Sequence, residues 1–253
     1  MEKETSPAVV HARAYKERAA INTPELSGLL VPDETYLKRV ADYLEQAAHA
    51  PGKPEVCGAY AALIQETLAQ FAAMKGITIA PWDDTGEPYA NSREMRRDVT
   101  ENRHLFFFRT VNGFGEGETA QHPMLAPSGY CDAQGRPLLV NDIFRIVHDY
   151  FGHTQRGFSF GPKGEYSAFQ EHARMYSKAA LPALAAETLA QNAWVNYGPH
   201  MRRPDGTVPR PGEPDYVPPR NRRFADQKAF VVPWDLLAQD PNPESITRSI
   251  PLR

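Results

Sequence analysis

One short stretch of the chain concentrates side chains that can bind a metal ion. His148, Asp149 and His153 come first, and Glu165 and His172 follow within the same segment. Imidazole nitrogens and carboxylate oxygens suit iron, zinc and manganese. Two histidines and one carboxylate on one face of an ion form the facial triad of non-haem Fe(II) oxygenases, whose open positions take O₂ and substrate. A metal site is therefore the first chemistry that this segment predicts.

The spacing of the two leading histidines is awkward for a regular helix. His148 lies on the apolar stripe of a predicted helix over residues 142–151, and His153 lies five positions further on. Positions i and i+5 of an α-helix are about 140° apart, so the two rings would diverge. Gly152 offers a solution, because a glycine can end the helix and turn the chain back. We therefore predict a helix break at Gly152, with His148 and His153 as metal ligands.

The third ligand must come from a later helix. In the predicted helix over residues 182–197, Glu187 and Gln191 share a face with leucine and tryptophan side chains. A carboxylate on such a face is expected to be buried, and buried polar groups need partners. Glu187 is therefore the predicted third metal ligand. Gln191 is predicted to hydrogen-bond the ligating side chains, because such partners fix the tautomer of ligating histidines.

A further predicted helix, over residues 164–179, carries a second polar group. Glu165 and His172 share one of its faces, whereas Glu171 points elsewhere. We predict that His172 and Asp149 assist the site, and that Glu165 either joins it or makes a polar contact between helices. Glu165, Glu171 and His172 also leave open a second metal ion.

Hydrophobic periodicity and helix-capping residues predict a mainly α (α+β) fold, whose helical bundle core carries the metal site. Asp33 and Asn91 are the predicted N-caps of two helices. The aromatic run HLFFFRT, residues 104–110, is predicted to be a strand buried on both faces. The other predicted elements are a helix at 54–75 and strands at 77–82 and 229–234.

The chain divides into three predicted parts. Residues 1–20 are a loosely docked N-terminal arm, and residues 21–197 form a single mainly helical catalytic domain. Residues 198–253 are an extended segment rich in proline and arginine, followed by a tail packed on the core.

The segment FRIVHDYFGH resembles the iron-binding segment of the aromatic amino acid hydroxylases. The resemblance implies that His148 and His153 are the two iron ligands. The family's third ligand is a glutamate on a later helix, in an aromatic setting similar to WVNYG here. Asn196 stands at that place, and Thr154 stands where the family has a proline. Nothing before residue 140 resembles this family, so a pterin cosubstrate is not predicted.

The same region, from residue 141 to residue 198, also resembles a domain of large multidomain phage and plasmid proteins. That domain has no settled chemistry, so this resemblance predicts no activity.

Three functions follow as hypotheses. The first is an Fe(II) oxygenase or hydroxylase that uses O₂ on a small, aromatic or amphipathic organic substrate. The second is a metal-dependent phosphohydrolase built on the His148–Asp149 doublet, with His104 or His122 upstream and Asp205 downstream. The third is a non-catalytic module that binds phosphate or an acidic partner surface through arginines. Those arginines are Arg202, Arg203, Arg210, Arg220, Arg222 and Arg223.

Composition limits the classes of protein to which this chain can belong. The chain has 253 residues, of which 42% are hydrophobic and 23% charged, with a formal net charge of −3. This is a globular composition with no global charge that favours nucleic acid. Its two cysteines, Cys57 and Cys131, do not form a CxxC motif, which argues against a zinc ribbon. A secretory signal and a membrane span are not expected, so a cytoplasmic protein is predicted. The sequence makes no prediction of oligomeric state.

Overall fold

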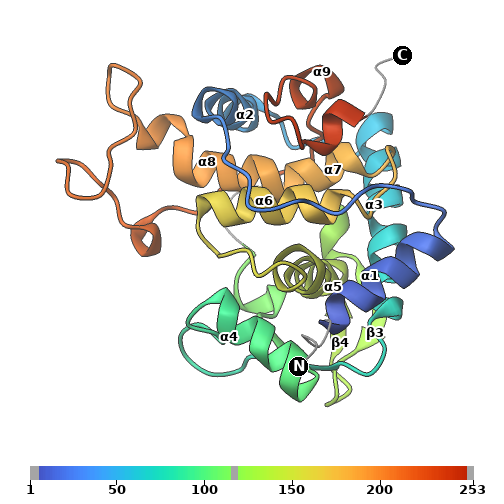
Figure 1. Cartoon of the computed structure of the whole chain (residues 1–253). Helices are drawn as coiled ribbons and strands as arrows, with labels where there is room; N and C mark the ends of the chain where they lie inside the picture. Colours follow the sequence, from blue (N-terminus) through green and yellow to red (C-terminus); the bar gives the residue numbers. More distant parts are fainter. Residues whose placement is uncertain (1–5, 115–118, 250–253) are drawn as a thin grey trace.

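The computed structural model describes residues 6–114 and 119–249, and helices dominate it (Figure 1). The predicted mainly α (α+β) class is confirmed. The α-helices are α1 (Pro7–Arg18), α2 (Glu34–Gln46), α3 (Pro54–Ala73), α4 (Ser92–Arg97), α5 (Val140–Val147), α6 (Pro162–Ala173), α7 (Leu181–Ala185), α8 (Gln191–Tyr197) and α9 (Trp234–Leu237). Three π-helical segments continue α-helices, and they are η1 (Asp98–Asn102), η4 (His148–Thr154) and η5 (Ala186–Ala190).

Capping side chains set the beginnings of several helices. Asp33 accepts a hydrogen bond from the Tyr36 amide, and Asn91 accepts from the first amides of α4, as predicted. Asp142 lies in the first turn of α5 and is fully buried. One of its oxygens accepts from the Leu139 amide and the other from the amide and hydroxyl of Thr110. Asp142 therefore fixes the start of the helix that leads into the candidate site.

Two hydrophobic clusters hold the helix that carries the histidines. The larger cluster joins α2, α3, α6, α7 and α8, which are stacked above and beside α5 in Figure 1. The smaller cluster joins α1, β2 and the opposite side of α5 and η4. Phe144 belongs to the first cluster, while Ile143, Val147 and Phe151 belong to the second. The α5–η4 segment is thus packed on both sides, which suits a site that needs fixed side chains.

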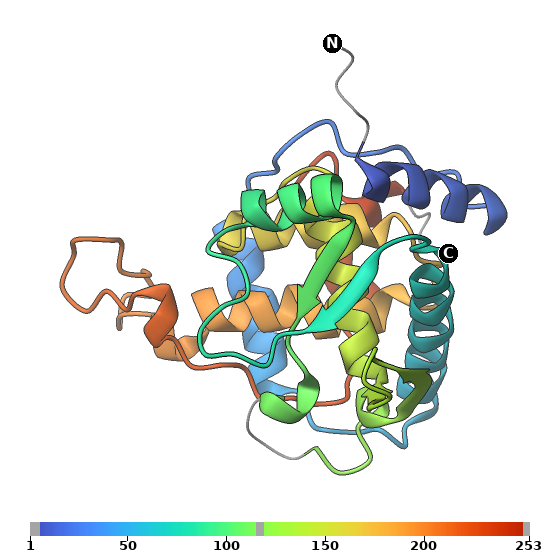
Figure 2. The same cartoon turned by 90° about the horizontal axis from the view of Figure 1, so that it is seen from below.

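The sheets are small and lie at the edge of the helical core. Strands β1 (Thr78–Pro81) and β2 (His104–Phe107) pair in parallel, and Figure 2 shows them side by side. Strands β3 (Pro127–Cys131) and β4 (Pro137–Leu139) pair antiparallel. The prediction that β2 is buried on both faces is wrong, because its burial alternates. Leu105 and Phe107 enter the core, whereas Phe106 is partly exposed and packs edge-on against Trp82.

Two further segments differ from expectation. The predicted N-terminal arm contains α1, whose Ala8, Ala12 and Tyr15 are buried. His11 Nδ1 on this helix lies 2.7 Å from the Tyr150 hydroxyl, so α1 is docked on η4; residues 1–5 of the arm lie outside the described residues. Residues 229–234 do not form the predicted strand in the described chain, and α9 begins at Trp234 instead.

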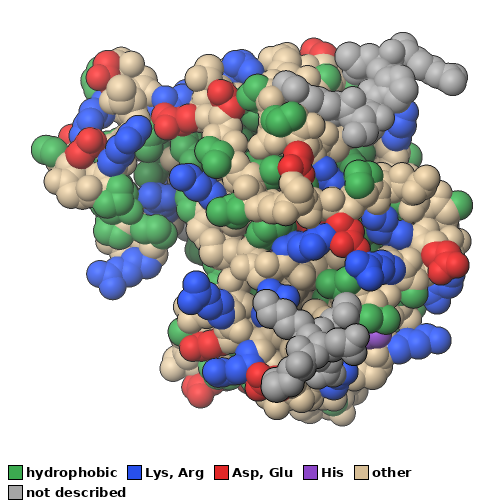
Figure 3. All heavy atoms as spheres, in the orientation of Figure 1, with side chains coloured by type: hydrophobic (Ala, Val, Ile, Leu, Met, Phe, Trp, Pro, Cys, Tyr) green, Lys and Arg blue, Asp and Glu red, His purple; other side chains and the backbone are tan. Residues whose placement is uncertain are grey.

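The proline- and arginine-rich segment projects from the body as loops, seen on the left of Figures 1 and 2. It carries both signs of charge, and side chains of both signs are interspersed on the face shown in Figure 3. Several of its arginines have partners within the chain: Arg202 binds Asp42 at 2.8 Å and Arg203 lies 3.2 Å from Glu213. The chain then returns to the core, where Ala229, Val232 and Leu237 are buried. Among the described residues, none of the helices is sufficiently long and apolar to span a membrane.

Candidate metal centre

A π-helical turn brings the two histidines to the same side of their helix. Helix α5 runs without interruption into η4, so the predicted break at Gly152 is wrong. A π-helix bonds residue i to residue i+5, which sets residues five apart nearly above one another. The rings of His148 and His153 lie with centroids 5.2 Å apart and planes at 87°. The widened turn therefore does what a helix break was expected to do.

Gly152 is needed here for close packing. A Cβ atom added at this position would lie 3.2 Å from the Ala168 carbonyl oxygen and 3.2 Å from Cε1 of His148. Both contacts are tighter than ordinary van der Waals contacts. The glycine therefore lets η4 approach α6 and leaves room for the His148 ring.

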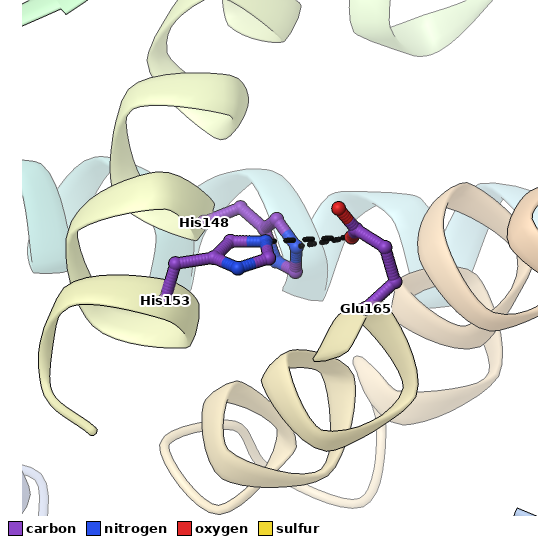
Figure 4. A group of neighbouring side chains, drawn as sticks. All are labelled: His148, His153 and Glu165. Atoms are coloured by element: carbon purple, nitrogen blue, oxygen red, sulfur yellow. Dashed lines mark ion pairs between the residues drawn. The ribbon is translucent and has the colours of Figure 1, made fainter. Parts of the chain in front are cut away.

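Glu165, in the first turn of α6, supplies the carboxylate that faces both rings (Figure 4). Its Oε2 lies 3.7 Å from Nε2 of His148 and 3.4 Å from Nε2 of His153. Donor atoms of all three side chains lie within 4.8 Å of one another. Two donors bound to one ion at about 2.1 Å are about 3.0–3.4 Å apart, so the group needs little movement to close on a metal.

The second nitrogen of each imidazole is occupied elsewhere. Nδ1 of His153 lies 3.0 Å from the Phe158 carbonyl oxygen, which can only accept a hydrogen bond. Nδ1 of His153 therefore carries a hydrogen, which leaves Nε2 as the nitrogen that faces Glu165 and can become a metal donor when it loses its own proton. Nδ1 of His148 lies 3.2 Å from Nδ1 of His172, which leaves Nε2 of His148 facing Glu165 as well.

Charges in the metal-free site depend on one another. Burial opposes the charge on His153, but the Glu165 carboxylate outweighs burial and raises the pKa of His153 to about 9. Burial likewise opposes charge on Glu165, and the two histidines lower its pKa to about 2. Burial raises the pKa of Asp149, which lies near both histidines, and lowers the pKa of His172 well below its usual value. In the metal-free site the proton on His153 balances the charge of the Glu165 carboxylate. A bound cation can replace that proton and balance the same charge.

Glu187, the predicted third ligand, lies in a separate buried cluster. It accepts hydrogen bonds from the Tyr60 hydroxyl and from Gln191 Nε2, the latter at 3.2 Å. Its Oε1 is also 3.6 Å from Nε2 of His122. The prediction is therefore corrected: the carboxylate that meets His148 and His153 is Glu165.

The Glu187 cluster does not resemble a second metal site. His122 Nδ1 accepts a hydrogen bond from the Met124 amide at 3.2 Å, so the hydrogen of the neutral ring is on Nε2. A nitrogen that carries hydrogen cannot donate to a metal. Burial lowers the pKa of His122 to about 4, which keeps this ring neutral at physiological pH.

Substituting Glu187 tests this assignment through the pH dependence of stability. Burial raises the pKa of Glu187 from 4.5 to about 7, so this group favours the folded state most below pH 4.5. Its contribution is lost as pH rises through 7, by about 3 kcal/mol in total. Glutamine does not titrate. We therefore expect the unfolding free energy of Glu187→Gln, relative to wild type, to rise by about 2.5 kcal/mol between pH 5 and pH 8. Urea unfolding at each pH measures it, and parallel pH profiles for the two proteins would contradict it.

The remaining predicted site residues separate into two groups. His172 contacts His148, and its assisting role stays a prediction. Gln191 does not support the histidines, because it bonds Glu187 and Gln227 at 3.2 Å each. Glu171 accepts from the Leu26 amide at 3.0 Å and so points away from the site, which leaves it out of any second metal site.

Sequence reasoning missed two parts of the site. The Phe158 carbonyl and Gln70 of α3 both hold histidine nitrogens. A backbone carbonyl leaves no trace in residue types, and Gln70 lies on a helix far away in the sequence. The shared helical face of Glu165 and His172 was the available sign that Glu165 belongs with the histidines.

Fold and site together define a mainly helical protein with a candidate centre of two histidines and one glutamate. Comparison with known proteins finds no family model, no curated protein and no solved structure that matches the chain. The resemblance to the aromatic amino acid hydroxylases therefore stays a prediction.

Proposed function

We propose that this chain is a mononuclear non-haem Fe(II) enzyme that uses O₂ to oxygenate a small organic substrate. His148, His153 and Glu165 hold the metal. The observation that carries the proposal is the convergence of two imidazole Nε2 atoms on one oxygen of Glu165. Each Nδ1 has a partner of its own, so the pair of donors is set by hydrogen bonds and not by chance proximity.

Three protein donors on one side of an ion leave its other positions for O₂ and substrate. Bound iron would supply the activation of O₂, and the chain's residues supply ligation and orientation. The histidines are well buried, whereas the Glu165 side chain is 29% exposed, so the site opens on the carboxylate side. Phe160, which is 42% exposed, packs edge-on against His153 with ring centroids 5.2 Å apart. This apolar surface beside the opening favours a substrate with an aromatic or aliphatic part.

The phosphohydrolase hypothesis has less support. Asp149 does lie beside both histidines. However, His104 is bound to Asp98 at 2.7 Å, and His122 has its Nδ1 occupied by the Met124 amide. Asp205 lies in the projecting segment and binds Thr207. The upstream histidine and downstream aspartate of that arrangement are therefore engaged elsewhere. A zinc hydrolase with the same three ligands is the remaining hydrolytic alternative, since such ligand sets also serve zinc.

The test is metal analysis joined to O₂ consumption. Protein purified without oxygen and titrated with Fe(II) should bind one ion per chain. It should then consume O₂ faster than free Fe(II) at the same concentration, and Glu165→Gln should lose both properties. One tightly bound zinc ion that supports ester or phosphodiester hydrolysis, with no O₂ consumption by the Fe(II) form, would overturn the oxygenase proposal. Absence of any bound metal would reduce the site to an ion pair between His153 and Glu165.

A further inference from the structure

A buried chain of hydrogen bonds runs from helix α3 to the candidate ligand His148. Gln70 Nε2 donates to the Met175 carbonyl at 3.2 Å, and Gln70 Oε1 lies 2.8 Å from Nε2 of His172. Nδ1 of His172 then lies 3.2 Å from Nδ1 of His148. Gln70 and His172 are both 0% exposed. The chain therefore joins α3, α6 and η4, and its Gln70–His172 part is out of contact with solvent.

This chain has a single allowed direction. A carbonyl oxygen only accepts, so the amide nitrogen of Gln70 must face Met175 and its oxygen must face His172. That oxygen also only accepts, so Nε2 of His172 carries the hydrogen. A neutral imidazole has one such hydrogen, so Nδ1 of His172 is an acceptor. The hydrogen between the two rings therefore belongs to Nδ1 of His148.

We propose that Gln70 and His172 are positioning residues that set the tautomer of His148, so that its Nε2 is the metal donor. The proposal rests on the proposed metal centre and adds to it a helix, α3, that supplies none of its ligands. Removing the acceptor oxygen of Gln70 frees His172 to carry its hydrogen on Nδ1. His148 would then have to carry its hydrogen on Nε2, the atom that must bind the metal.

The tautomer of His148 is controlled through the hydrogen-bond chain from Gln70 to His172, which we call the relay. The rings of Phe144, Phe151 and Tyr176 pack around His172 with centroids 6.5 Å, 6.5 Å and 4.9 Å away. Among the described residues, the hydrogen-bond partner found for Nδ1 of His148 is Nδ1 of His172, and burial of an unpaired donor is costly. His153 is controlled directly by the Phe158 carbonyl. The two candidate ligands thus reach the same tautomer by different routes, which gives the test an internal reference.

The experiment compares Gln70→Leu with Gln70→Glu, using Co(II) alone as the probe. Leucine removes the acceptor, whereas glutamate keeps an acceptor oxygen toward His172. We expect Gln70→Leu to weaken Co(II) binding by about 10- to 100-fold, which is the usual cost of removing a hydrogen-bond partner of a ligating histidine. Gln70→Glu should stay close to wild type. Gln170→Leu is the matched control, because Gln170 is equally buried on α6 but binds Asp240 and the Ile246 amide; it should lose stability and keep Co(II) affinity.

Proton spectra of the Co(II) form separate positioning from general damage. The wild type should show two shifted, slowly exchanging N–H resonances, from Nδ1 of His148 and of His153. In Gln70→Leu the His148 resonance should broaden or exchange rapidly, while the His153 resonance stays. If Gln70→Leu keeps both resonances and its Co(II) affinity, the relay is overturned and the metal centre stands. If the wild type binds no Co(II), the metal centre and the relay are both overturned.

Discussion

Replacing Glu165 with glutamine should abolish stoichiometric metal binding, whereas replacing Glu187 with glutamine should leave it intact. Glu165 Oε2 is the one carboxylate oxygen grouped with the two histidines in the described chain. Glutamine has the same shape but no charge, so one of three donors becomes a poor one. We expect affinity for Zn(II) or Co(II) to fall by about 100-fold or more. This exceeds the loss of about 10- to 100-fold expected when a hydrogen-bond partner of a ligand is removed. Competition with a coloured chelator measures this affinity.

Glu187→Gln is the matched control, because it removes a carboxylate that is more deeply buried than Glu165 and also lies beside a histidine. Circular dichroism of both metal-free variants checks that each is folded. The opposite pattern, with metal lost from Glu187→Gln and kept by Glu165→Gln, would restore the ligand set predicted from the sequence. It would also mean that the observed arrangement around Glu165 is not the metal-binding one.

The helices were largely predictable because local rules govern them. Asp33 and Asn91 cap helices as expected, since a short polar side chain before an apolar run satisfies the first free amides wherever it occurs. The strand β2 was located correctly, but its burial was not. A run of aromatics cannot reveal that Phe106 lies on the partly exposed face of the strand, where its ring contacts Trp82, Tyr89 and His104.

The histidine pair was predictable, but the way in which it forms was not. Its prediction assumed 3.6 residues per turn, so that residues five apart had to diverge unless the helix ended. The π-helical turn at η4 removes that assumption. Nothing in the local residue types distinguishes a widened turn from a broken one, because Gly152 suits both. Gly152 packs closely against Ala168 of α6, and the local sequence does not reveal such a contact between helices.

The third ligand could not be chosen from periodicity alone. Glu187 was correctly expected to be buried, and it is. Its partners, however, are Tyr60 and His122, which come from distant parts of the chain. Periodicity identifies which face of a helix is buried but does not identify what that face meets. Two glutamates on half-apolar faces were therefore equivalent until the helices were placed.

Replacing Gly164 with alanine should damage both the fold and the metal site. A Cβ at Gly164 would lie 1.9 Å from the Ser159 carbonyl oxygen and 2.5 Å from its Oγ. Backbone atoms cannot rotate away, so either the loop before α6 or the first turn of α6 must move. The loop carries the Phe158 carbonyl that holds His153, and the first turn carries Glu165. We expect a loss of about 3 kcal/mol or more in unfolding free energy, at the upper end for overpacking.

Metal affinity should fall together with stability, because either movement displaces one of the three donors or the hydrogen-bond partner of one. Gly161→Ala is the matched control: its added Cβ has no heavy atom of the described chain within 4 Å. Gly161 is the N-cap of the same helix, so this change should cost within about 1 kcal/mol. Thermal unfolding and Co(II) titration of both variants provide the comparison. Equal behaviour of the two alanines would mean that the loop yields freely, and a loop that yields freely could not hold His153 and Glu165 in place for a metal.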